Sequence, residues 1–303
     1  MTAELQSIIE HAGEILLGKR DRIRLAICCL LARGHLLIED IPGVGKTTLA
    51  HTLAHLLGMH YQRIQFTSEL LPADILGVSV YDRQRSDFVF HPGPIFSQLV
   101  LADEINRATP KAQSALLEAM EERQVTVEGE TRALPQPFFV IATQNPSHQI
   151  GTFPLPESQL DRFTMRIGIG YPDRAAERQL LSGTDRRSLL EGSQPLLSPE
   201  QLEVYQQQVA SIHISEALLD YCQNLLAYSR SAEPFRQGLS PRAGLAMLQT
   251  ARAWAMLEGR NHVLPEDLQA VLSATIGHRL FLTGEEEGGS GAVSLLLESV
   301  AVD

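Results

Sequence analysis

Cysteine is scarce in this 303-residue chain, and the few that occur are not spaced as metal ligands. Cys28 and Cys29 are adjacent within the apolar run LAICCLLA, Cys222 stands alone, and no C-x-x-C pair exists. This pattern favours buried thiols over a disulfide framework. His51 and His55 have the i, i+4 spacing of metal ligands, but HTLAH lacks the glutamate of H-E-x-x-H and no third ligand follows. The sequence therefore predicts no zinc site.

Long hydrophobic runs are also missing. No apolar stretch approaches the ~18 residues that a membrane span requires. The first residues, MTAELQSIIEHAGEIL, are amphipathic and acidic, unlike a secretory signal. We therefore expect a cytoplasmic protein without a membrane span.

Basic residues are outnumbered by acidic ones. The chain has 25 Lys and Arg against 36 Asp and Glu, which gives a formal net charge of −11. An excess of negative charge opposes constitutive binding to a phosphate backbone, although a local basic patch would remain compatible with it. The charge balance therefore argues against nucleic acid as a partner.

Short apolar runs alternate with helical stretches in the first part of the chain. Helical spacing is found at 3–16, 19–33, 46–58 and 110–122. Five apolar runs are placed like buried parallel strands, at 35–39, 61–66, 98–103, 137–143 and 164–170. This alternation predicts an α/β fold, in which helices flank both faces of a parallel sheet.

After Tyr171-Pro172 the strand-like runs stop. Helical patterns follow at 174–181, 199–211, 215–230, 241–258 and 265–280. We therefore expect an α/β core over 1–175, a linker over 176–198, and a small all-helical domain over 199–303. The stretch GEEEGGSG at 284–291 predicts a loop before a last apolar segment.

Two insertions are predicted within the core. Residues 76–94 have the pattern of a hairpin placed in the second helix, and 123–134 alternate as strand-turn-strand about Glu128-Gly129. Such hairpins could contact a substrate or be passive decoration of a sheet edge.

The segment EDIPGVGKTT at 39–48 is the strongest motif in the chain. It follows the phosphate-binding pattern G-x-x-x-x-G-K-[ST], with Asp40 in place of the first glycine, and it joins a predicted strand to a predicted helix. Glycines let backbone amides approach phosphates, and the helix start directs its positive dipole end at them. The predicted nucleotide-binding residues of this loop are Asp40, Pro42, Gly43, Val44, Gly45, Lys46, Thr47 and Thr48.

Three of these residues have specific expected roles. Lys46 would reach the β- and γ-phosphates of a nucleotide, and the Thr47 hydroxyl would ligate Mg²⁺. Asp40 stands at the strand end, where its carboxylate can point away from the anion.

An acidic pair ends the apolar run LVLAD-E at 99–104. Asp103 would hold Mg²⁺ and Glu104 would deprotonate an attacking water. We expect this pair on a strand that neighbours the one before the phosphate loop. Acidic pairs of this kind also occur simply as helix caps.

Polar residues that could complete the site occur further along the chain. Asn145 ends the run VIATQN and could bind the γ-phosphate or the water, or could simply begin a turn before Pro146. Arg162, in QLDRF, could reach a neighbouring subunit's γ-phosphate or could form a surface ion pair with Asp161. Arg242, in LSPRAGLAML, would fold over the phosphates from the helical domain.

Together these motifs resemble the AAA+ ATPases, and within them the MoxR family, over almost the whole chain. The strings that carry the resemblance are GHLLIEDIPGVGKT, ADILGVSVYD, FHPGPIF, LADEINRATPKAQSALLEAMEERQVTVEG, FFVIATQNP, LPESQLDRF and LSPRAG. In this family the loop often begins as it does here, so Asp40 is expected as a family feature.

The resemblance implies a P-loop core and a helical lid domain that bind ATP and Mg²⁺. It assigns Lys46 and Thr47 to the Walker A motif and Asp103 and Glu104 to Walker B. It also implies Asn145 as sensor 1, Arg162 as an arginine finger acting in trans, and Arg242 as sensor 2. Arg107, in EINR, is a second candidate for contacts in trans.

The implied function is an ATPase of a homo-oligomeric ring, most often a hexamer, that remodels, assembles or activates protein complexes. A protein client and an adaptor with a von Willebrand factor A domain are the expected partners. The alternatives are a motor directed at nucleic acid and a magnesium chelatase-like metal-insertion subunit. No helix-turn-helix or winged-helix signature supports the first, and the N-K-x-D motif of GTPases is absent.

Overall fold

A central sheet of five parallel strands organises the first half of the chain. Its order is β2-β5-β8-β1-β9. The strands are β1 Leu36–Glu39, β2 Tyr61–Gln65, β5 Leu99–Asp103, β8 Phe139–Gln144 and β9 Met165–Ile167. The computed structural model describes residues 3–84, 86–145, 151–183, 189–190, 192–284 and 290–302. The predicted parallel sheet is confirmed.

The strand order differs from expectation at one place that matters. The strand carrying Asp103 was expected to adjoin β1, but β8 lies between them and pairs with β1 on one side and β5 on the other. The expectation was wrong because the sequence shows which runs are strands and contains no information on their lateral order. As a result, the carboxyl end of β8 lies between those of β1 and β5.

Helices cover both faces of this sheet. Side chains alternate between two hydrophobic clusters along each central strand: Leu99 and Leu101 belong to one, Val100 and Ala102 to the other. The first cluster contains residues of α1 Ala3–Ile15, α2 Arg20–Leu31 and α3 Lys46–Leu56. The second contains residues of α4 Pro72–Leu76, the 3₁₀ turn η1 Ile105–Arg107 and α5 Pro110–Glu122. Burial on both faces explains why these strands are apolar throughout.

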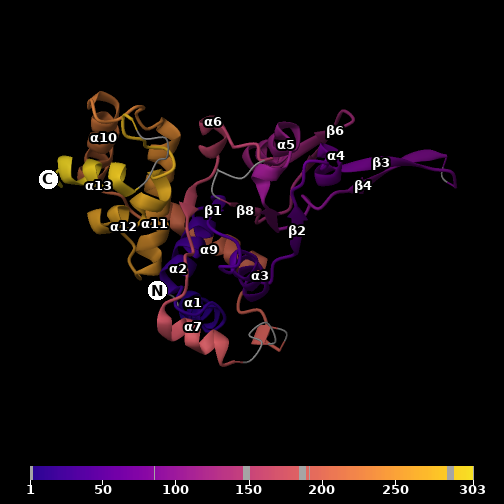
Figure 1. Ribbon diagram of the computed structural model, residues 1–303, viewed down its shortest axis with the longest axis horizontal. Coiled ribbons are helices and arrows are strands. Elements are labelled where there is room, and N and C mark those ends of the chain that lie inside the picture. Colours follow the sequence, from indigo (N-terminus) through magenta and orange to yellow (C-terminus); the bar gives the residue numbers. More distant parts are fainter. Residues whose placement is uncertain are drawn as a thin grey trace.

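The remaining chain is helical, and its helices pack on the first cluster. We call α9 to α13 the lid; they are α9 Pro199–Ser211, α10 Glu216–Ser231, α11 Pro241–Leu257, α12 Pro265–Ile276 and α13 Ser290–Ser299. Ser198, Ser215 and Ser240 cap α9, α10 and α11 by accepting a hydrogen bond from the third helical amide. Lid residues and α2 residues share one continuous core, so the lid is packed against the body (Figure 1).

The region between sheet and lid contains more helix than a linker would. Helix α7 occupies Arg174–Leu181 and is capped by Asp173, so the first residues of the expected linker 176–198 are helical. Residues 184–188 and 191 of that linker lie outside the described residues, as do residues 285–289 of the expected loop 284–291. The short helix α6, Glu157–Leu160, precedes β9.

Two antiparallel hairpins extend from the body. Strands β3 Gly77–Asp82 and β4 Asp87–Pro92 form a long ribbon that projects far from the sheet (Figure 1). Strands β6 Gln124–Val127 and β7 Glu130–Ala133 turn at Glu128 and Gly129, which have φ angles of 54° and 82°. Positive φ at both central residues gives the turn twist that a two-residue hairpin prefers. None of the helices in the described part of the chain has the length and apolar character of a membrane span.

Candidate active site

The phosphate loop joins β1 to α3 at the carboxyl edge of the sheet. Gly43 and Gly45 have φ angles of 84° and 101°, a left-handed conformation that side chains with a Cβ rarely adopt. Helix α3 begins at Lys46 directly after Gly45. The free amides of its first turn are therefore directed into the loop, which is the geometry that binds phosphate.

Asp40 holds this loop in place from behind. Its Oδ2 accepts hydrogen bonds from the amides of Ile169 and Gly170, and its Oδ1 accepts one from Ile41 at 2.8 Å. The carboxylate thus points away from the loop interior, and only the main-chain oxygen faces Lys46. This is the orientation expected for Asp40 at the strand end, and the side chain ties the loop to the segment after β9. A contact of Asp40 with nucleotide stays a prediction.

Lys46 spans the loop to the end of β8. Its Nζ donates to the Asp40 carbonyl and, at 2.8 Å, to Oδ1 of Asn145. The residue is only 8% exposed. Burial lowers the pKa of this ammonium, and the nearby carboxylates of Asp40, Asp103 and Glu104 oppose that shift. The carboxylates thus favour the charged form of Lys46, which is the form that attracts a phosphate.

Asp103 is held by two hydrogen-bond donors. Thr143 donates to its Oδ1 at 2.6 Å, and Nε and Nη2 of Arg63 lie 3.1 and 2.6 Å from its Oδ2. Arg63 is on β2 and was not singled out from the sequence. Its position could be foreseen only once β2 and β5 were known to pair, because Arg63 and Asp103 lie diagonally on one face of the sheet.

Glu104 leaves the end of β5 in a left-handed conformation, with a φ of 56°. Strained backbone of this kind in a residue other than glycine is characteristic of functional sites. Its carboxylate accepts from Asn145 Nδ2 at 3.2 Å and from Gln65 Nε2 at 3.1 Å, and Arg107 Nη1 lies 3.2 Å away. Arg107 thus contacts Glu104 of its own chain.

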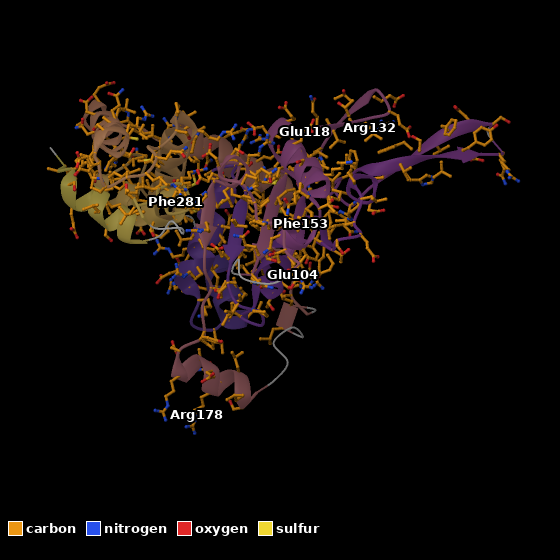
Figure 2. All side chains as sticks on the ribbon, turned by 45° about the horizontal axis from the view of Figure 1, so that its top comes forward. Glu104, Glu118, Arg132, Phe153, Arg178 and Phe281 are labelled. Carbon is orange, nitrogen blue, oxygen red and sulfur yellow. The ribbon has the colours of Figure 1, made fainter. Side chains whose placement is uncertain are left out.

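These groups face one cavity of about 250 Å³. It is lined by Pro42, Gly43, Gly45, Lys46, Thr47, Thr48, Asp103, Glu104 and Asn145. The structure thus brings together the residues predicted from three separate motifs. Among the lining residues, Thr47 supplies a hydroxyl oxygen and Asp103 carboxylate oxygens, which is the oxygen-only donor set that Mg²⁺ takes alongside phosphate oxygens. Figure 2 shows Glu104 in the body, with Phe281 of the lid on one side and Arg132 of the β6–β7 hairpin on the other.

A second cavity of about 550 Å³ adjoins the loop and was not predicted. It shares Gly43, Gly45 and Thr48 with the first. Its other walls are the α1–α2 turn, Val44, Tyr171-Pro172 and α7, with Ile15, Leu16, Leu17, Lys19, Glu177, Leu180 and Leu181 completing the lining. An apolar cavity beside a phosphate loop fits a nucleobase and ribose. The signal available in the sequence was Gly18, which turns at a φ of 68° and packs against α7.

Known proteins match the chain over these elements. Residues 35–165 match the ATPase family associated with various cellular activities (AAA), and residues 227–295 match the AAA lid domain. The chain is 36% identical to Chaperone MoxR1 of Mycobacterium tuberculosis, over 98% of this chain and 82% of that protein. It is 33% identical to Protein MoxR of Paracoccus denitrificans, over 89% of this chain and 86% of that protein. The chain belongs to the MoxR family of AAA+ ATPases.

Two further relatives extend over nearly the whole chain. YeaC of Bacillus subtilis is 43% identical over 93% of this chain and 88% of its own length. A crystal structure of a candidate ATPase from Cytophaga hutchinsonii superposes with a TM-score of 0.88 at 33% identity, covering 99% of this chain and 95% of that one. The family, the loop and the carboxylates of Asp103 and Glu104 agree on one activity. This MoxR-family protein binds nucleotide and is an ATP hydrolase.

Arg162 and Arg242 lie apart from both cavities of this AAA+ core. Arg162 Nη1 donates to the Leu117 carbonyl at 2.7 Å, and its Nε lies 3.3 Å from Glu121 on α5. Arg242 pairs with the same Glu121 carboxylate and lies 4.0 Å from Asp161. Arg242 therefore lies away from the cavity of its own chain in this structure, and its expected contact with phosphates stays a prediction. The lid is packed so that the start of α11 lies over α5 and Asp161.

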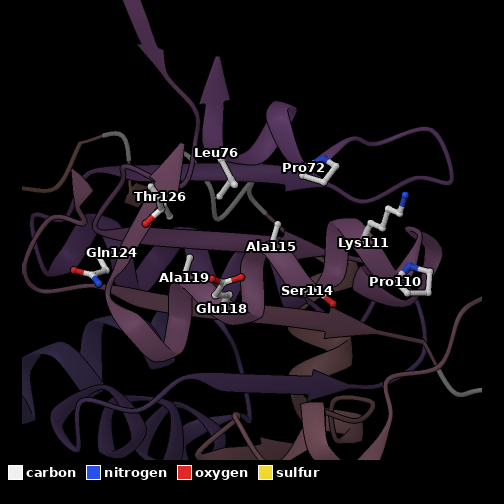
Figure 3. Close-up of a pocket in the computed structure, with 11 residues that line it drawn as sticks. Pro72, Leu76, Pro110, Lys111, Ser114, Ala115, Glu118, Ala119, Gln124 and Thr126 are labelled. Atoms are coloured by element: carbon white, nitrogen blue, oxygen red, sulfur yellow. The ribbon is translucent and has the colours of Figure 1, made fainter. Parts of the chain in front are cut away.

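A third cavity lies outside the nucleotide site. This groove of about 510 Å³ runs between α4, α5 and β6 and shares no lining residue with the first two. Figure 3 shows Pro72 and Leu76 on one side, with Ser114, Ala115 and Glu118 of α5 and Thr126 of β6 around it. None of the residues that place phosphate or water lies here, so the groove is separate from the chemistry.

Proposed function

We propose that this MoxR-family ATPase works as a homo-oligomeric ring in which Arg162 and Arg242 serve the nucleotide of a neighbouring copy. One observation carries the proposal: both arginines meet at Glu121, away from the cavity that contains Lys46 and Glu104. Neither can act on a phosphate bound there in its own chain without a large rearrangement. A neighbour's site is the alternative that leaves the packing of the lid intact.

Chemistry in the cavity would start from groups of one chain. Glu104 would accept the proton of the attacking water, and Asn145, which contacts both Glu104 and Lys46, would hold that water in line. Thr47 and Asp103 would hold Mg²⁺, which neutralises the phosphate oxygens. Lys46 is the one cationic side chain among the residues lining this cavity in the described part of the chain. The outer side of the γ-phosphate would thus face a site in need of further positive charge.

The charges around Arg162 and Arg242 support their role at the nucleotide of a neighbouring copy. Arg162, Arg242 and the buried Arg279 gather about two carboxylates, Glu121 and Asp161. One positive charge remains in excess, which favours an anion supplied from outside the chain. An arginine at the γ-phosphate contributes about 10³-fold or more to the rate in related phosphate-transfer sites. A ring most often built from six copies would supply one at every interface.

The substrate that this ATPase remodels is proposed to be a protein. MoxR1 is named a chaperone, which supports remodelling of a protein complex as the task; an adaptor that contains a von Willebrand factor A domain is part of this proposal. The β3–β4 hairpin supports a polypeptide contact, because Val78 and Val80 on one face of the ribbon, and Tyr81 and Phe88 on the other, are each about half or more exposed. Apolar side chains exposed together mark interaction surfaces. The proposal includes the expected division of the chain into a core over 1–175, a linker over 176–198 and a lid over 199–303.

Mixed assemblies test the trans arrangement. Arg162→Ala should bind ATP and hydrolyse it poorly, and Lys46→Ala should not bind it. When the two inactive variants are mixed, some interfaces pair an intact phosphate loop with an intact arginine, so ATPase activity should exceed that of both parents. Specific activity of the wild type should also rise with protein concentration. A mixture that stays inactive despite demonstrated co-assembly, or a fully active monomer, would refute the proposal.

A further inference from the structure

We propose that Arg279 is a positioning residue: it fixes the segment that carries Arg162 to the lid, so that the lid sets the place of the arginine offered to the neighbouring copy. This inference rests on the proposed function in trans. It concerns a residue outside both nucleotide cavities, three residues after the end of α12.

The segment around Arg162 has little structure of its own. Helix α6 has four residues, none of them buried, and a single turn is unstable without tertiary contacts. Between α6 and β9 the chain bends at Asp161 and Arg162, and Phe163 inserts into the core with 0% exposure. The position of Arg162 therefore depends on what holds its two neighbours, as well as on the contacts of its side chain with Leu117 and Glu121.

Arg279 holds both of these neighbours. Its Nη2 donates to the carbonyl of Asp161 at 2.8 Å and to that of Phe163 at 2.7 Å, and its Nε lies 2.8 Å from Oδ1 of Asp161. Its side chain is 6% exposed. One guanidinium thus contacts the residue on each side of Arg162. Buried ion pairs with satisfied carbonyl contacts resist displacement far better than exposed ones, because breaking them leaves unpaired charge.

We call the contacts of Arg279 with Asp161 and Phe163 the clamp. The Arg279 side chain is also held from within the lid. Nη1 of Arg279 donates to the Thr275 carbonyl at 2.7 Å, one turn back on α12. Thr275 is fully buried and its hydroxyl lies 3.2 Å from that of Thr250 on α11. The clamp is therefore anchored to two lid helices, so a movement of the lid would be transmitted to residues 161–163.

Neighbouring lid residues contact the same segment. The buried His278 contacts the Phe163 carbonyl through Nε2 at 3.0 Å, and Arg236 forms an ion pair with Glu157 of α6. Ser240, the N-cap of α11, lies 3.4 Å from Asp161. Among all of these, only Arg279 contacts both residues that flank Arg162. The lid and the arginine segment are therefore expected to move as one unit.

The test is Arg279→Gln, with Arg252→Gln as the matched control. Arg252 is also a partly buried lid arginine that donates to a carbonyl, that of Ile212, within the lid. Arg279→Gln should lower kcat by about 10²-fold, as a misplaced catalytic group does, while ATP affinity and ring assembly stay as in the wild type. Arg252→Gln should retain wild-type kcat. Arg279→Lys, which keeps the charge and can reach one carbonyl, should recover part of the loss.

Two combinations show whether Arg279 acts through Arg162. In an Arg162→Ala background, Arg279→Gln should add less than a twofold further loss, because residues acting as one unit are not additive. Arg279→Gln chains mixed with Lys46→Ala chains should regain activity, since the latter supply an intact arginine to the former's intact phosphate loop. Full additivity, or a mixture that stays inactive, would overturn the inference.

The outcomes separate this inference from the proposal beneath it. If Arg162→Ala alone retains full activity, the proposal that Arg162 acts in trans is refuted. If Arg162→Ala is impaired and Arg279→Gln is not, only the clamp fails. Loss of ATP binding or assembly in Arg279→Gln, but not in Arg252→Gln, would assign Arg279 to lid folding and would likewise overturn the positioning role.

Discussion

Arg63 occupies Oδ2 of Asp103, the carboxylate expected to hold Mg²⁺, with contacts of 2.6 and 3.1 Å. Arg63 also donates to Gln65 at 2.7 Å, and Gln65 in turn donates to Glu104 at 3.1 Å. Strand β2 therefore connects the two acidic residues of the site by side-chain hydrogen bonds. The guanidinium partly offsets negative charge that would otherwise repel the phosphates of a nucleotide.

We expect Arg63→Gln to change how ATP binding depends on Mg²⁺. Without Arg63, the Asp103 carboxylate should repel metal-free ATP more strongly, whereas bound Mg²⁺ should largely mask the change. Arg63 is 48% exposed, so the ion pair is worth about 1 kcal/mol and the affinity for metal-free ATP should fall about fivefold. Titrations with ATP in EDTA and in Mg²⁺ measure the two dissociation constants, and their ratio reports the dependence on Mg²⁺. Arg83→Gln, an equal charge change on the distant hairpin, is the control; an unchanged ratio in Arg63→Gln would contradict the expectation.

Glu104→Gln should separate binding from hydrolysis. The amide keeps a polar group beside Asn145 but cannot accept the proton of the attacking water, so turnover should fall by about 10²-fold or more. ATP affinity should stay near that of the wild type, because Lys46 and Asp103 remain. Binding of a fluorescent ATP analogue and release of phosphate report the two steps. Glu118→Gln, in the separate groove, should behave as wild type; wild-type turnover by Glu104→Gln would show that another group is the base.

Local pattern was enough to predict the sheet and the phosphate loop. The strand from 99 to 103 is apolar because both of its faces are buried, and such burial is visible in composition. Glycines at 43 and 45 mark a loop that needs positive φ, and this requirement is likewise local. The family resemblance then assigned the separate motifs to one nucleotide site, and Lys46, Asp103, Glu104 and Asn145 do line one cavity.

Lateral arrangement and domain packing were not predictable in this way. The place of β8 between β1 and β5 depends on hydrogen bonds between runs that are far apart in the sequence: Leu36 pairs with Ile141, and Leu99 pairs with Phe139. Equally apolar runs can pair in more than one order. The motif of Arg242 predicts a role at phosphates but gives no orientation of the lid. The contact with Glu121 depends on how the lid packs on α5. The second cavity escaped notice because its walls come from α1, α7 and Tyr171, each unremarkable alone.

The second cavity should contribute to nucleotide affinity through its apolar wall. Leu180 on α7 is 49% exposed and lines it, whereas Leu189 is 50% exposed and does not. If the base and ribose cover Leu180, Leu180→Ser should weaken ATP binding about fivefold, the value of roughly half a leucine side chain. Leu189→Ser should have no effect. Binding of tripolyphosphate, which lacks adenosine, should be equal in both variants; a matching loss for tripolyphosphate would place the effect on the phosphates instead.

Acid should destabilise the fold through His35, the residue directly before β1. Its Nδ1 accepts from the Val140 amide at 3.0 Å, and its Nε2 lies 3.2 Å from the Met120 carbonyl, so the neutral ring fits between β8 and α5. Burial lowers the pKa of His35 from 6.5 to about 4. Between these values the unfolded chain binds a proton that the folded chain does not, so stability falls as pH falls through this window. From pH 7 to pH 5 the loss in the free energy of unfolding should be about 2 kcal/mol, since one pKa unit corresponds to about 1.4 kcal/mol.

Denaturant unfolding at both pH values measures this loss of stability. In His35→Gln, whose amide can supply the same donor and acceptor without titrating, this share of the loss should vanish, leaving that of the buried His278, whose pKa burial also lowers. An equal loss in the wild type and in His35→Gln would show that His35 is not its source.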